Sequence, residues 1–452
     1  MPREHLLKVG VSGVRGVVGE FLTPALACAI GQAFGAYVGG GRVVVGRDTR
    51  ASGEMLQHAV TCGLLAAGCE VTDVGVLPTP TIQMFIPAAR ATGGLALTAS
   101  HNPPEYNALK FFNARGLFFN NYERSELLDL WHQSEFRQAT NEEIRAVRCD
   151  YDTPPRLHVE RVLKHIDVER VRARRFRVAL DAVNGAGSVL SCRFLRKSLN
   201  CDLHAIAVDP SQPFPRVAEP RPDTLGQLAE LVRRERCEIG FAQDPDGDRL
   251  AVCDETGRVL DNDDVLALAA DDVLERMPGD VVVNLTTSSV MDDVAAWYGC
   301  KVHRTPVGEA NVVEKMQAVG AVFGGEGANG GIIFDAVHLC RDSYTAMAFL
   351  LDRMARTGAT VSALLSRLPR YFRESDTLPF AHGRMGSVIQ ALEASFPDAR
   401  ADRSDGVKLM LAEGWIHVRP SNTEPLVRLS AEARTEEGLA VLCRRARHVL
   451  ES

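Results

Sequence analysis

Short apolar runs alternate with amphipathic stretches from the N-terminus to about residue 331. Each run is rich in Val, Ile, Leu or Ala, ends in a loop of Gly, Asp, Ser or Asn, and is followed by a helical pattern. This strand, loop, helix alternation is typical of α/β domains with mixed, mainly parallel sheets. The apolar runs predict strands at residues 42–45, 70–74, 95–97, 177–180, 239–243, 281–285, around 302 and 321–323.

Signals for helices fit between these runs. Thr23 and Pro24 suit the N-cap and first position of a helix that we expect to extend to about Tyr37. Residues 120–172 are polar, and we expect them to be helical. Residues 324–331 are so rich in glycine that we expect a loop there.

The alternation restarts twice, after the Thr-Pro-Pro break at residues 153–155 and near Leu260. It therefore predicts three consecutive α/β domains of similar architecture. After Arg370 the pattern changes to short strands and two helices, which predicts a C-terminal α+β domain with an antiparallel sheet. The predicted elements there are a first strand, a helix at 385–396, strands at 408–411, 415–419 and 427–430, and a final helix. We predict four domains, covering residues 1–154, 155–254, 255–369 and 370–452.

Composition narrows the class of partner. Hydrophobic residues make up 46% of the 452 residues, and the formal net charge is −7 with both signs interspersed. There is no basic footprint for nucleic acid and no apolar run long enough for a signal peptide or a membrane span, so we expect a small-molecule partner. The eleven cysteines include no C-x-x-C pair, a pattern of reduced thiols that predicts a cytoplasmic protein.

A serine loop follows the apolar run at residues 95–97. Ser100 and His101 come directly after it, and the prolines at 103 and 104 prevent the backbone from continuing as helix or inner strand. Ser100 is a candidate nucleophile, with His101 and Lys110 near enough in sequence to assist it. An ordinary polar turn explains this stretch equally well when it is taken alone.

Three aspartates follow the strand predicted at residues 239–243. Asp244, Asp246 and Asp248 alternate with Pro and Gly, and such crowded carboxylates suit Mg²⁺. A solvated acidic turn is the alternative. An EF-hand is less suitable, because residues 249–253 have the pattern of a strand and supply no further ligands.

Further groups suit a phosphorylated ligand. The loop at residues 419–425, with Arg428 beyond it, combines arginines, hydroxyls and an amide, as a phosphate dianion requires, although a turn with exposed arginines is the alternative. Arg15 lies in a glycine-punctuated segment that could bring a guanidinium close to an anion. Glu326 and Asn329 offer acceptors for sugar hydroxyls, but their glycine-rich loop could equally be structural.

Together these motifs resemble the α-D-phosphohexomutase family. The segments that carry the resemblance occur in the family's order along the whole chain, and they are GVSGVRG, VGRDTR, TASHNPPEYNALKFF, DAVNGAG, DPDGDR, TPVGEANV, the GGEG loop and RPSNTEPLVR. The resemblance implies four domains around a central cleft, each of which contributes one loop to the site. It also implies a monomer or homodimer that binds a hexose phosphate.

The resemblance assigns roles to the candidate residues. Ser100 would be the phosphoserine and would hold Mg²⁺ together with the three aspartates. Arg15, Arg249 and Lys110 would lie near the transferring group, with Lys110 as the proton shuttle and His101 as the alternative. The substrate would be bound by Thr305, Gly308, Glu326, Asn329, Arg419, Ser421, Asn422, Thr423 and Arg428.

The implied reaction moves a phosphoryl group between C6 and C1 of a hexose phosphate, with a hexose 1,6-bisphosphate as intermediate and activator. The Lys-Phe-Phe segment that begins at Lys110 resembles the glucosamine branch, so we expect glucosamine 6-phosphate and glucosamine 1-phosphate as the substrate pair. Phosphomannomutase or phosphoglucomutase activity is the nearest alternative. Two rival functions are a silent sugar-phosphate binding protein and a phosphatase that uses Ser100.

Two departures from the family pattern bear on this expectation. Many members carry Glu-x-Ser-Gly-His in the sugar loop, whereas residues 326–331 contain no histidine. Ala108 also replaces a usual glycine before Lys110. Sugar preference and the position of the loop before Lys110 therefore cannot be carried over from the family.

Overall fold

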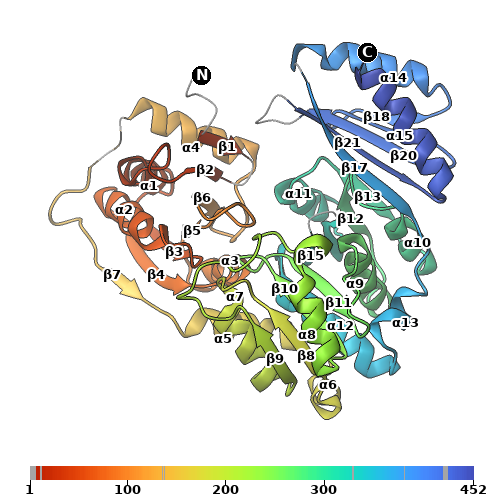
Figure 1. Ribbon diagram of the computed structural model, residues 1–452. Coiled ribbons are helices and arrows are strands. Elements are labelled where there is room, and N and C mark those ends of the chain that lie inside the picture. Colours follow the sequence, from red (N-terminus) through yellow and green to blue (C-terminus); the bar gives the residue numbers. More distant parts are fainter. Residues whose placement is uncertain are drawn as a thin grey trace.

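The computed structural model describes residues 7–10, 13–134, 136, 138–327, 330–380, 382–420 and 426–451. These residues form four β-sheets that follow one another along the chain, and we call the parts that carry them domains 1 to 4. Figure 1 shows domain 1, in red and orange, facing the blue domain 4 across the molecule, with the green domains 2 and 3 joining them below. The predicted class of three α/β domains and one α+β domain is confirmed.

Domain 1 contains a mixed seven-stranded sheet. Its strands, in spatial order, are β1 (Leu7–Gly10), β2 (Gly13–Val17), β6 (Tyr106–Asn113), β5 (Gly93–Leu97), β3 (Arg42–Arg47), β4 (Glu70–Val76) and β7 (Val147–Cys149). The pairs from β5 to β7 are parallel, and those from β1 to β5 are antiparallel. Helices α1 (Pro24–Tyr37), α2 (Gly53–Ala66), α3 (Thr79–Ala88) and α4 (Asn121–Gln133) accompany the sheet.

The helix predicted from the Thr23-Pro24 signal is confirmed as α1. The Thr23 hydroxyl accepts a hydrogen bond from the Leu26 backbone at 3.2 Å, which satisfies one of the unpaired donors of the first turn. Our expectation that residues 120–172 are helical is wrong in part. The described residues between α4 and α5 (Thr153–Leu163) are not helical, and three of them form the edge strand β7 beside β4.

Domains 2 and 3 carry smaller mixed sheets. In domain 2 the strand order is β11 (Leu250–Asp254), β10 (Ile239–Gln243), β8 (Arg177–Asp181) and β9 (Asp202–Ile206), with only the β10 and β11 pair antiparallel. In domain 3 it is β13 (Val302–Thr305), β12 (Val281–Asn284), β14 (Phe323–Glu326), β15 (Gly331–Phe334) and β16 (His338–Arg341). The helices are α6 (Val168–Arg174), α7 (Gly187–Arg193), α8 (Gly226–Glu235), α9 (Asn262–Arg276), α10 (Val290–Trp297), α11 (Glu309–Val319), α12 (Ser343–Thr357) and α13 (Val361–Leu365).

The glycine-rich stretch at 324–331 is shorter as a loop than we expected. Gly324 and Gly325 belong to strand β14, and Gly331 begins β15. A Cβ on Gly324 would lie 2.5 Å from Met316 Sδ, and one on Gly325 would lie 2.5 Å from the Gly331 carbonyl oxygen. These glycines therefore reflect close packing in a strand and not a turn.

Domain 4 is built on an antiparallel sheet. Its order is β17 (Phe372–Pro379), β21 (Leu426–Ala433), β20 (Gly414–Pro420), β19 (Val407–Met410) and β18 (Arg400–Asp402). Strand β18 was not predicted. Helices α14 (Met385–Ser395) and α15 (Glu436–Glu451) pack on one face and close a separate hydrophobic core. The opposite face is free to carry polar groups toward domain 3 and the site.

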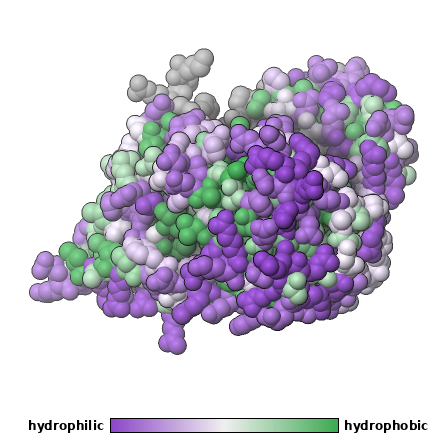
Figure 2. Space-filling view, turned by 60° about the horizontal axis from the view of Figure 1, so that its bottom comes forward, coloured by the Kyte–Doolittle hydropathy of each residue, from purple (hydrophilic) through white to green (hydrophobic). Residues whose placement is uncertain are grey.

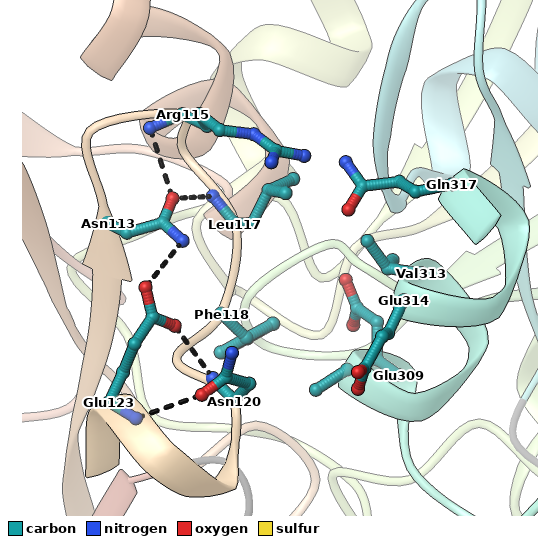
Figure 3. Close-up of a pocket in the computed structure, with 11 residues that line it drawn as sticks. Asn113, Arg115, Leu117, Phe118, Asn120, Glu123, Glu309, Val313, Glu314 and Gln317 are labelled. Carbon is teal, nitrogen blue, oxygen red and sulfur yellow. Dashed lines mark hydrogen bonds between the residues drawn. The ribbon is translucent and has the colours of Figure 1, made fainter.

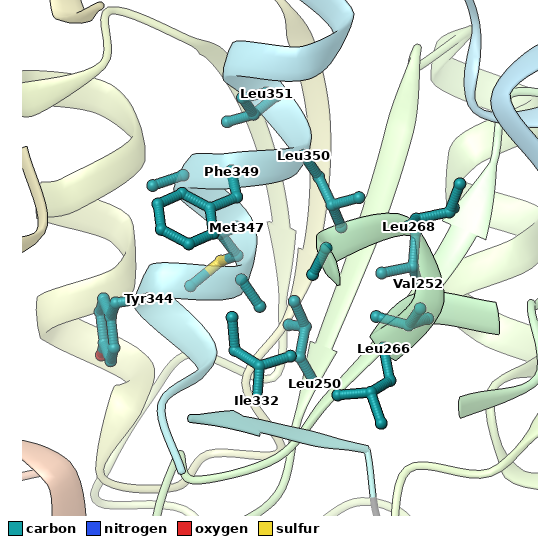
Figure 4. Packing of buried hydrophobic residues seen from close by; sticks show 14 of the residues in the cluster. Leu250, Val252, Leu266, Leu268, Ile332, Tyr344, Met347, Phe349, Leu350 and Leu351 are labelled. Carbon is teal, nitrogen blue, oxygen red and sulfur yellow. The ribbon is translucent and has the colours of Figure 1, made fainter. Parts of the chain in front are cut away.

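Domains 2 and 3 share one continuous hydrophobic core. Figure 4 shows Leu250 and Val252 of β11 packed against Leu266 of α9 and Met347 of α12. Burial of so many apolar side chains in one cluster holds the two domains together and fixes the loops that leave them.

Polar contacts join domain 4 to domain 3. The buried Lys408 Nζ donates to the Leu285 carbonyl at 2.6 Å, and Glu432 Oε1 accepts from the Ser289 backbone at 2.8 Å. Asp405 Oδ2 accepts from the Val307 backbone at 3.2 Å. Domain 4 is thus attached through directional bonds, whereas domains 2 and 3 are joined through a core.

One face of the surface is shown in Figure 2. It is mostly hydrophilic, with hydrophobic residues gathered in groups among the hydrophilic ones. No helix in the described part of the chain has both the length and the apolar character needed to cross a membrane.

Candidate functional site

The serine loop connects β5 to β6 and reaches across to domain 2. Ser100 is buried, its φ is +49°, and its Oγ donates a hydrogen bond to Asp244 Oδ2 at 2.8 Å. Few non-glycine residues adopt such a φ, so the loop is held in a strained conformation. The structure therefore brings the predicted serine and the predicted aspartates together.

The three aspartates lie in the short loop between β10 and β11. All three are buried, and one carboxylate oxygen from each lies within 4.8 Å of the others. Asp246 Oδ1 and Asp248 Oδ1 have no hydrogen-bond partner among the described residues. Buried, unpartnered carboxylate oxygens at this spacing fit a hard divalent cation.

The aspartates differ electrostatically. Burial, followed by the charges of Asp248 and Asp246, raises the pKa of Asp244 well above its usual value. Burial also acts to raise the pKa of Asp246, but the charge of Lys110 and the hydrogen bonds with Asp244, Lys110 and Thr79 together outweigh it, and the pKa of Asp246 is lowered. The neighbouring carboxylates therefore repel one another, and a divalent cation bound among them would offset that repulsion.

Lys110 belongs to β6 and is buried against the aspartate loop. Its Nζ donates to Asp246 Oδ2 at 2.6 Å, and the Thr79 hydroxyl donates to the same oxygen at 2.6 Å. The Phe118 ring lies 5.6 Å from Nζ, measured to its centroid. The ammonium group is thus fixed by a carboxylate on one side and an aromatic face on the other.

His101 lies beside Ser100 but is differently placed. Its Nδ1 is buried without a hydrogen-bond partner in the described structure. Burial, followed by the charges of Arg249 and Arg15, lowers the pKa of His101 to about 2. The imidazole is therefore neutral at physiological pH.

Two arginines predicted to face the reacting group lie near each other. Arg15 Nη1 donates to Asn102 Oδ1 at 2.6 Å, and Arg249 Nη1 donates to Glu219 Oε1 at 2.8 Å. Burial and then the charge of Arg249 lower the pKa of Arg15. Two guanidinium groups held in proximity beside a serine form a place suited to an anion.

Glu326 ends β14 and meets the loop after β13. Its Oε1 accepts hydrogen bonds from the Gly308 backbone at 2.8 Å and from Asn284 Nδ2 at 3.0 Å. Thr305 ends β13, and its hydroxyl donates to the Pro306 carbonyl at 3.0 Å. Gly308 and Glu326 are therefore brought together as predicted, whereas Asn329 lies outside the described residues.

Arg341 is a site residue that sequence reasoning missed. Its guanidinium donates to Asp248 Oδ2 at 2.6 Å, to Glu309 Oε2 at 2.8 Å and to Glu326 Oε2 at 3.4 Å. Burial raises the pKa of Glu309 to about 7, against the opposing charge of Arg341. Arg341 ends β16, and nothing in its sequence context distinguishes it from a surface arginine.

Two further arginines lie on the open face of the domain 4 sheet. Arg419 of β20 and Arg428 of β21 are directly opposite in the strand register, and Arg419 Nη1 lies 3.9 Å from Asp405 Oδ2. Burial lowers the pKa of Arg419; Asp405 acts against this, and Arg428 adds to it. Like charges directly opposite on neighbouring strands are unfavourable without an anion. Ser421, Asn422 and Thr423 lie outside the described residues.

A cavity of about 300 Å³ lies between domains 1 and 3. Figure 3 shows Asn113, Phe118 and Glu123 on one wall and Glu314 and Gln317 of α11 on the other. Among the described residues, none of those predicted to form the site lines this cavity. The predicted residues that the structure brings together lie instead around the aspartates of domain 2, which Ser100 and Lys110 of domain 1 contact and which Arg341 of domain 3 also contacts.

Comparison with known protein families covers almost the whole chain. Four families match in order, described as phosphoglucomutase/phosphomannomutase alpha/beta/alpha domain I over residues 6–138, domain II over 156–257, domain III over 261–372, and the C-terminal domain over 387–449.

Individual relatives match over similar lengths. A "Probable phosphoglucosamine mutase" from Methanopyrus kandleri is 38% identical, with 95% of this chain and 94% of the relative covered. A "Phosphoglucomutase/phosphomannomutase" from Thermococcus kodakarensis is also 38% identical, with 95% of each chain covered. Among solved structures, a phosphoglucomutase/phosphomannomutase family protein from Burkholderia thailandensis aligns with a TM-score of 0.86 and 29% identity, covering 100% of this chain and 98% of that one.

Proposed function

Because this chain belongs to the phosphoglucomutase/phosphomannomutase family, a family of mutases, we propose that it moves a phosphoryl group between C6 and C1 of a hexose phosphate through phosphorylated Ser100. The observation that carries the proposal is the 2.8 Å hydrogen bond between Ser100 Oγ and Asp244 Oδ2. It places the hydroxyl that would carry the phosphoryl group beside a carboxylate cluster suited to a metal ion.

Asp244, Asp246 and Asp248 would hold Mg²⁺ together with an oxygen of the phosphoserine. Bound there, the cation would neutralise charge on the transferring phosphoryl group. Arg15 and Arg249 would bind the other phosphoryl oxygens, since their guanidinium groups face the same region and partly repel each other. The unpartnered oxygens of Asp246 and Asp248 support the assignment of the three aspartates as the Mg²⁺ site.

Lys110 is the proposed proton shuttle. In the forward step the Ser100 Oγ–P bond breaks, a bond forms between phosphorus and a sugar hydroxyl oxygen, and the hydroxyl proton passes through the shuttle to Ser100 Oγ. In the return step the other sugar O–P bond breaks, phosphorus bonds to Ser100 Oγ, and the Ser100 proton passes to the released sugar oxygen. The position of Lys110 supports this role, since its Nζ lies 2.6 Å from Asp246 Oδ2 in the loop that Ser100 Oγ also contacts, whereas His101, with a pKa lowered to about 2, is a poor base.

Arg419 and Arg428 would clamp the phosphate that is not reacting, with Ser421, Asn422 and Thr423 of the loop between them. The repulsion between the two guanidinium groups favours a bound dianion. One clamp must accept either end of the sugar, because the hexose 1,6-bisphosphate intermediate turns over before its second phosphoryl group returns to Ser100.

Glu326, supported by Gly308 and followed by Asn329, would bind sugar hydroxyls, with Thr305 at the end of the neighbouring strand. We propose glucosamine 6-phosphate and glucosamine 1-phosphate as the substrate pair. The relative from Methanopyrus kandleri carries the corresponding name, and the one from Thermococcus kodakarensis favours the alternative of a phosphoglucomutase or phosphomannomutase.

The decisive experiment combines intact mass with turnover. Purified protein and its Ser100→Ala variant are incubated with Mg²⁺ and, in separate reactions, with the 1-phosphates of glucosamine, mannose and glucose. We expect a gain of about 80 Da, one phosphoryl group, in wild type only, and fastest isomerisation of glucosamine 1-phosphate.

Each different outcome would point to a different function. Fastest isomerisation of mannose or glucose 1-phosphate would replace the proposed substrate. Free phosphate released faster than isomerised sugar would indicate a phosphatase. No mass gain after addition of glucose 1,6-bisphosphate, together with no turnover, would indicate a silent binding protein.

A further inference from the structure

We propose that Arg50 is a positioning residue that fixes the serine loop so that the phosphoryl group on Ser100 passes to the sugar and not to water. The inference rests on the proposed function. Arg50 follows β3, fifty residues before Ser100, and it is outside the set of residues that would touch substrate or metal. Its side chain is completely buried.

All five N–H groups of the Arg50 guanidinium have an acceptor. Nε donates to Asp48 Oδ2 at 3.1 Å. The other four donate to backbone carbonyls of the serine loop and the start of β6, which are Ser100 O at 2.6 Å, Asn102 O at 2.7 Å, Pro103 O at 2.7 Å and Tyr106 O at 3.0 Å. A guanidinium has five donors in a rigid plane, so one side chain defines the path of this loop.

A second chain of hydrogen bonds reaches the nucleophile from Asp48. The Thr98 hydroxyl donates to Asp48 Oδ2 at 2.6 Å and accepts from the Ser100 backbone N–H at 3.0 Å. Asp48 Oδ1 accepts from the Arg50 backbone N–H at 2.9 Å. Arg50 and Asp48 therefore hold Ser100 from both its carbonyl and its amide side.

This hold also spans two domains. The Phe214 ring, from the long loop of domain 2, lies 5.2 Å from the Arg50 guanidinium carbon, measured to the ring centroid. The neighbouring Thr49 hydroxyl donates to the Asn184 carbonyl of domain 2 at 2.8 Å. The segment that grips the serine loop is thus tied to the domain that carries the aspartates.

Such a hold matters because Ser100 has a left-handed φ of +49°. This conformation is unfavourable for serine and persists only where surrounding bonds enforce it. If the loop relaxed, the phosphorus would move relative to the bound sugar hydroxyl. In-line transfer to the fixed sugar oxygen slows when the phosphorus is displaced from it. Attack by water is less affected, because a mobile water molecule can align with the displaced phosphorus.

The productive reaction breaks the Ser100 Oγ–P bond, forms a bond from phosphorus to the sugar oxygen, and moves the proton of that sugar hydroxyl to Ser100 Oγ. The competing reaction forms the bond to a water oxygen, releases inorganic phosphate and returns a proton to Ser100. Both begin from the same phosphoserine. The ratio of phosphate release to sugar phosphorylation therefore reports the position of the phosphoryl group. This ratio does not depend on how much of a preparation is folded.

The experiment compares wild type with Arg50→Lys, with Arg47→Lys as the matched control. Arg47 lies in the same segment, but within the described structure its side chain is bound to Gln57, the Asp48 carbonyl and Glu54, away from the serine loop. Each protein is phosphorylated with glucose 1,6-bisphosphate and freed of excess reagent. Phosphate release and sugar phosphorylation are then measured, together with kcat and KM for the preferred hexose 1-phosphate.

We expect Arg50→Lys to lower kcat by about tenfold to a hundredfold, change KM by less than about threefold, and raise phosphate release per mutase turnover by about tenfold. Arg47→Lys should match wild type. A Thr98→Val variant, which removes only the link from Asp48 to the Ser100 amide, should shift the ratio in the same direction. Guanidinium ion added to Arg50→Ala should lower the ratio toward the wild-type value.

An unchanged ratio in Arg50→Lys and Thr98→Val, with wild type active, would overturn the positioning role and leave the proposed function intact. Absence of phosphoserine and turnover in wild type itself would overturn the proposed function and the positioning role together. If Arg50→Lys does not fold, Thr98→Val alone decides the question.

Discussion

Arg341 of domain 3 and Asp248 of domain 2 form a buried ion pair, with Nη2 and Oδ2 2.6 Å apart. The same guanidinium contacts Glu309 and Glu326, so one side chain pairs with a carboxylate of the aspartate loop and with two carboxylates of domain 3. Removal of one partner from a buried pair leaves an uncompensated charge in a medium that solvates it poorly. The stability of the metal-free protein must therefore depend strongly on Arg341.

We expect Arg341→Gln to destabilise the metal-free protein by about 3 to 5 kcal/mol. A divalent cation would restore countercharge to Asp248, so the increase in melting temperature on adding Mg²⁺ should be larger in the variant than in wild type. Differential scanning calorimetry with EDTA and with Mg²⁺ measures both effects.

Arg304→Gln is the control for Arg341, because Arg304 pairs with the half-exposed Asp292. Arg304 also donates to backbone carbonyls at residues 284, 287 and 288 but to none of the three aspartates, so this variant should show the wild-type response to Mg²⁺. Equal Mg²⁺ shifts in Arg341→Gln and wild type would mean that Arg341 does not compensate the aspartate charge.

Gly185 packs against the backbone of the aspartate loop. A Cβ at this position would lie 2.6 Å from the Pro245 carbonyl oxygen and 2.7 Å from its Cα. Gly185→Ala must therefore displace the loop between Asp244 and Asp246, and we expect a fall in Mg²⁺ affinity of about tenfold or more and a loss of about 1 to 3 kcal/mol of stability. Isothermal titration calorimetry with Mg²⁺ measures the affinity.

Gly226→Ala provides the comparison for Gly185→Ala. Gly226 begins α8, and a Cβ there meets no atom within 4 Å. We expect Gly226→Ala to bind Mg²⁺ with the affinity of wild type. If Gly185→Ala also binds Mg²⁺ like wild type, the aspartate loop is not held by this contact.

Much of the site follows from local sequence because strand ends are recognisable. Ser100 and Asp244 each come after an apolar run, and buried strands do end at Leu97 and Gln243. Residue type and spacing therefore sufficed to predict a serine loop and an acidic loop. Their meeting across 144 positions follows from the packing of two domains, which only the resemblance to a family implied.

The local sequence assigned no role to the residues that were missed, although Arg50 lies in the VGRDTR segment that carries the family resemblance. Arg50 and Arg341 lie at or just after strand ends, where exposed arginines are common. Apart from the nearby Asp48, the acceptors of Arg50 lie 50 to 56 positions away in the sequence. Those of Arg341 lie 15 to 93 positions away. A buried ion network is a property of the tertiary fold, so composition and periodicity cannot reveal it. Gly324 misled for the opposite reason, since a glycine required by contact with Met316 looks like a turn glycine in sequence.

The opposed pair Arg419 and Arg428 predicts how domain 4 responds to phosphate. Arg428→Gln should raise KM for hexose 1-phosphates about tenfold or more, because a hydrogen bond to a charged group contributes about 1.5 to 3 kcal/mol. Without phosphate the variant should be as stable as wild type or more stable, since a cross-strand repulsion is removed. Melting temperatures with and without inorganic phosphate, together with KM, measure these effects.

Arg403→Gln is the control for Arg428→Gln. It tests whether replacing an arginine elsewhere in domain 4 also raises KM and changes the response to phosphate. Arg403 is exposed and pairs with Glu393 away from the opposed pair. The Arg403→Gln variant should have the KM of wild type and the same change in melting temperature on adding phosphate. A phosphate response that survives intact in Arg428→Gln would place the phosphate clamp elsewhere.

His338 predicts a pH dependence of stability at the contact between domains 1 and 3. Its Nε2 lies 3.3 Å from the Gly116 carbonyl oxygen, which can only accept, so Nε2 carries the proton of the neutral ring. Burial lowers the pKa of His338 to about 4, below the usual 6.5, although the bond to Gly116 opposes the shift. The unfolded chain therefore takes up a proton at higher pH than the folded protein does.

Stability from this shift is fully present above pH 6.5 and is lost as the pH falls from 6.5 toward 4. Between pH 7.5 and pH 5 the loss amounts to about 2 kcal/mol, since one pKa unit corresponds to about 1.4 kcal/mol. His338→Gln keeps a donor for Gly116 but does not titrate, so urea unfolding at the two pH values should show a smaller decrease in the variant by about this amount. The exposed His58, replaced by Gln, should leave the wild-type decrease unchanged. An equal decrease in His338→Gln and wild type would show that His338 does not remain neutral in the folded protein as the solution is acidified.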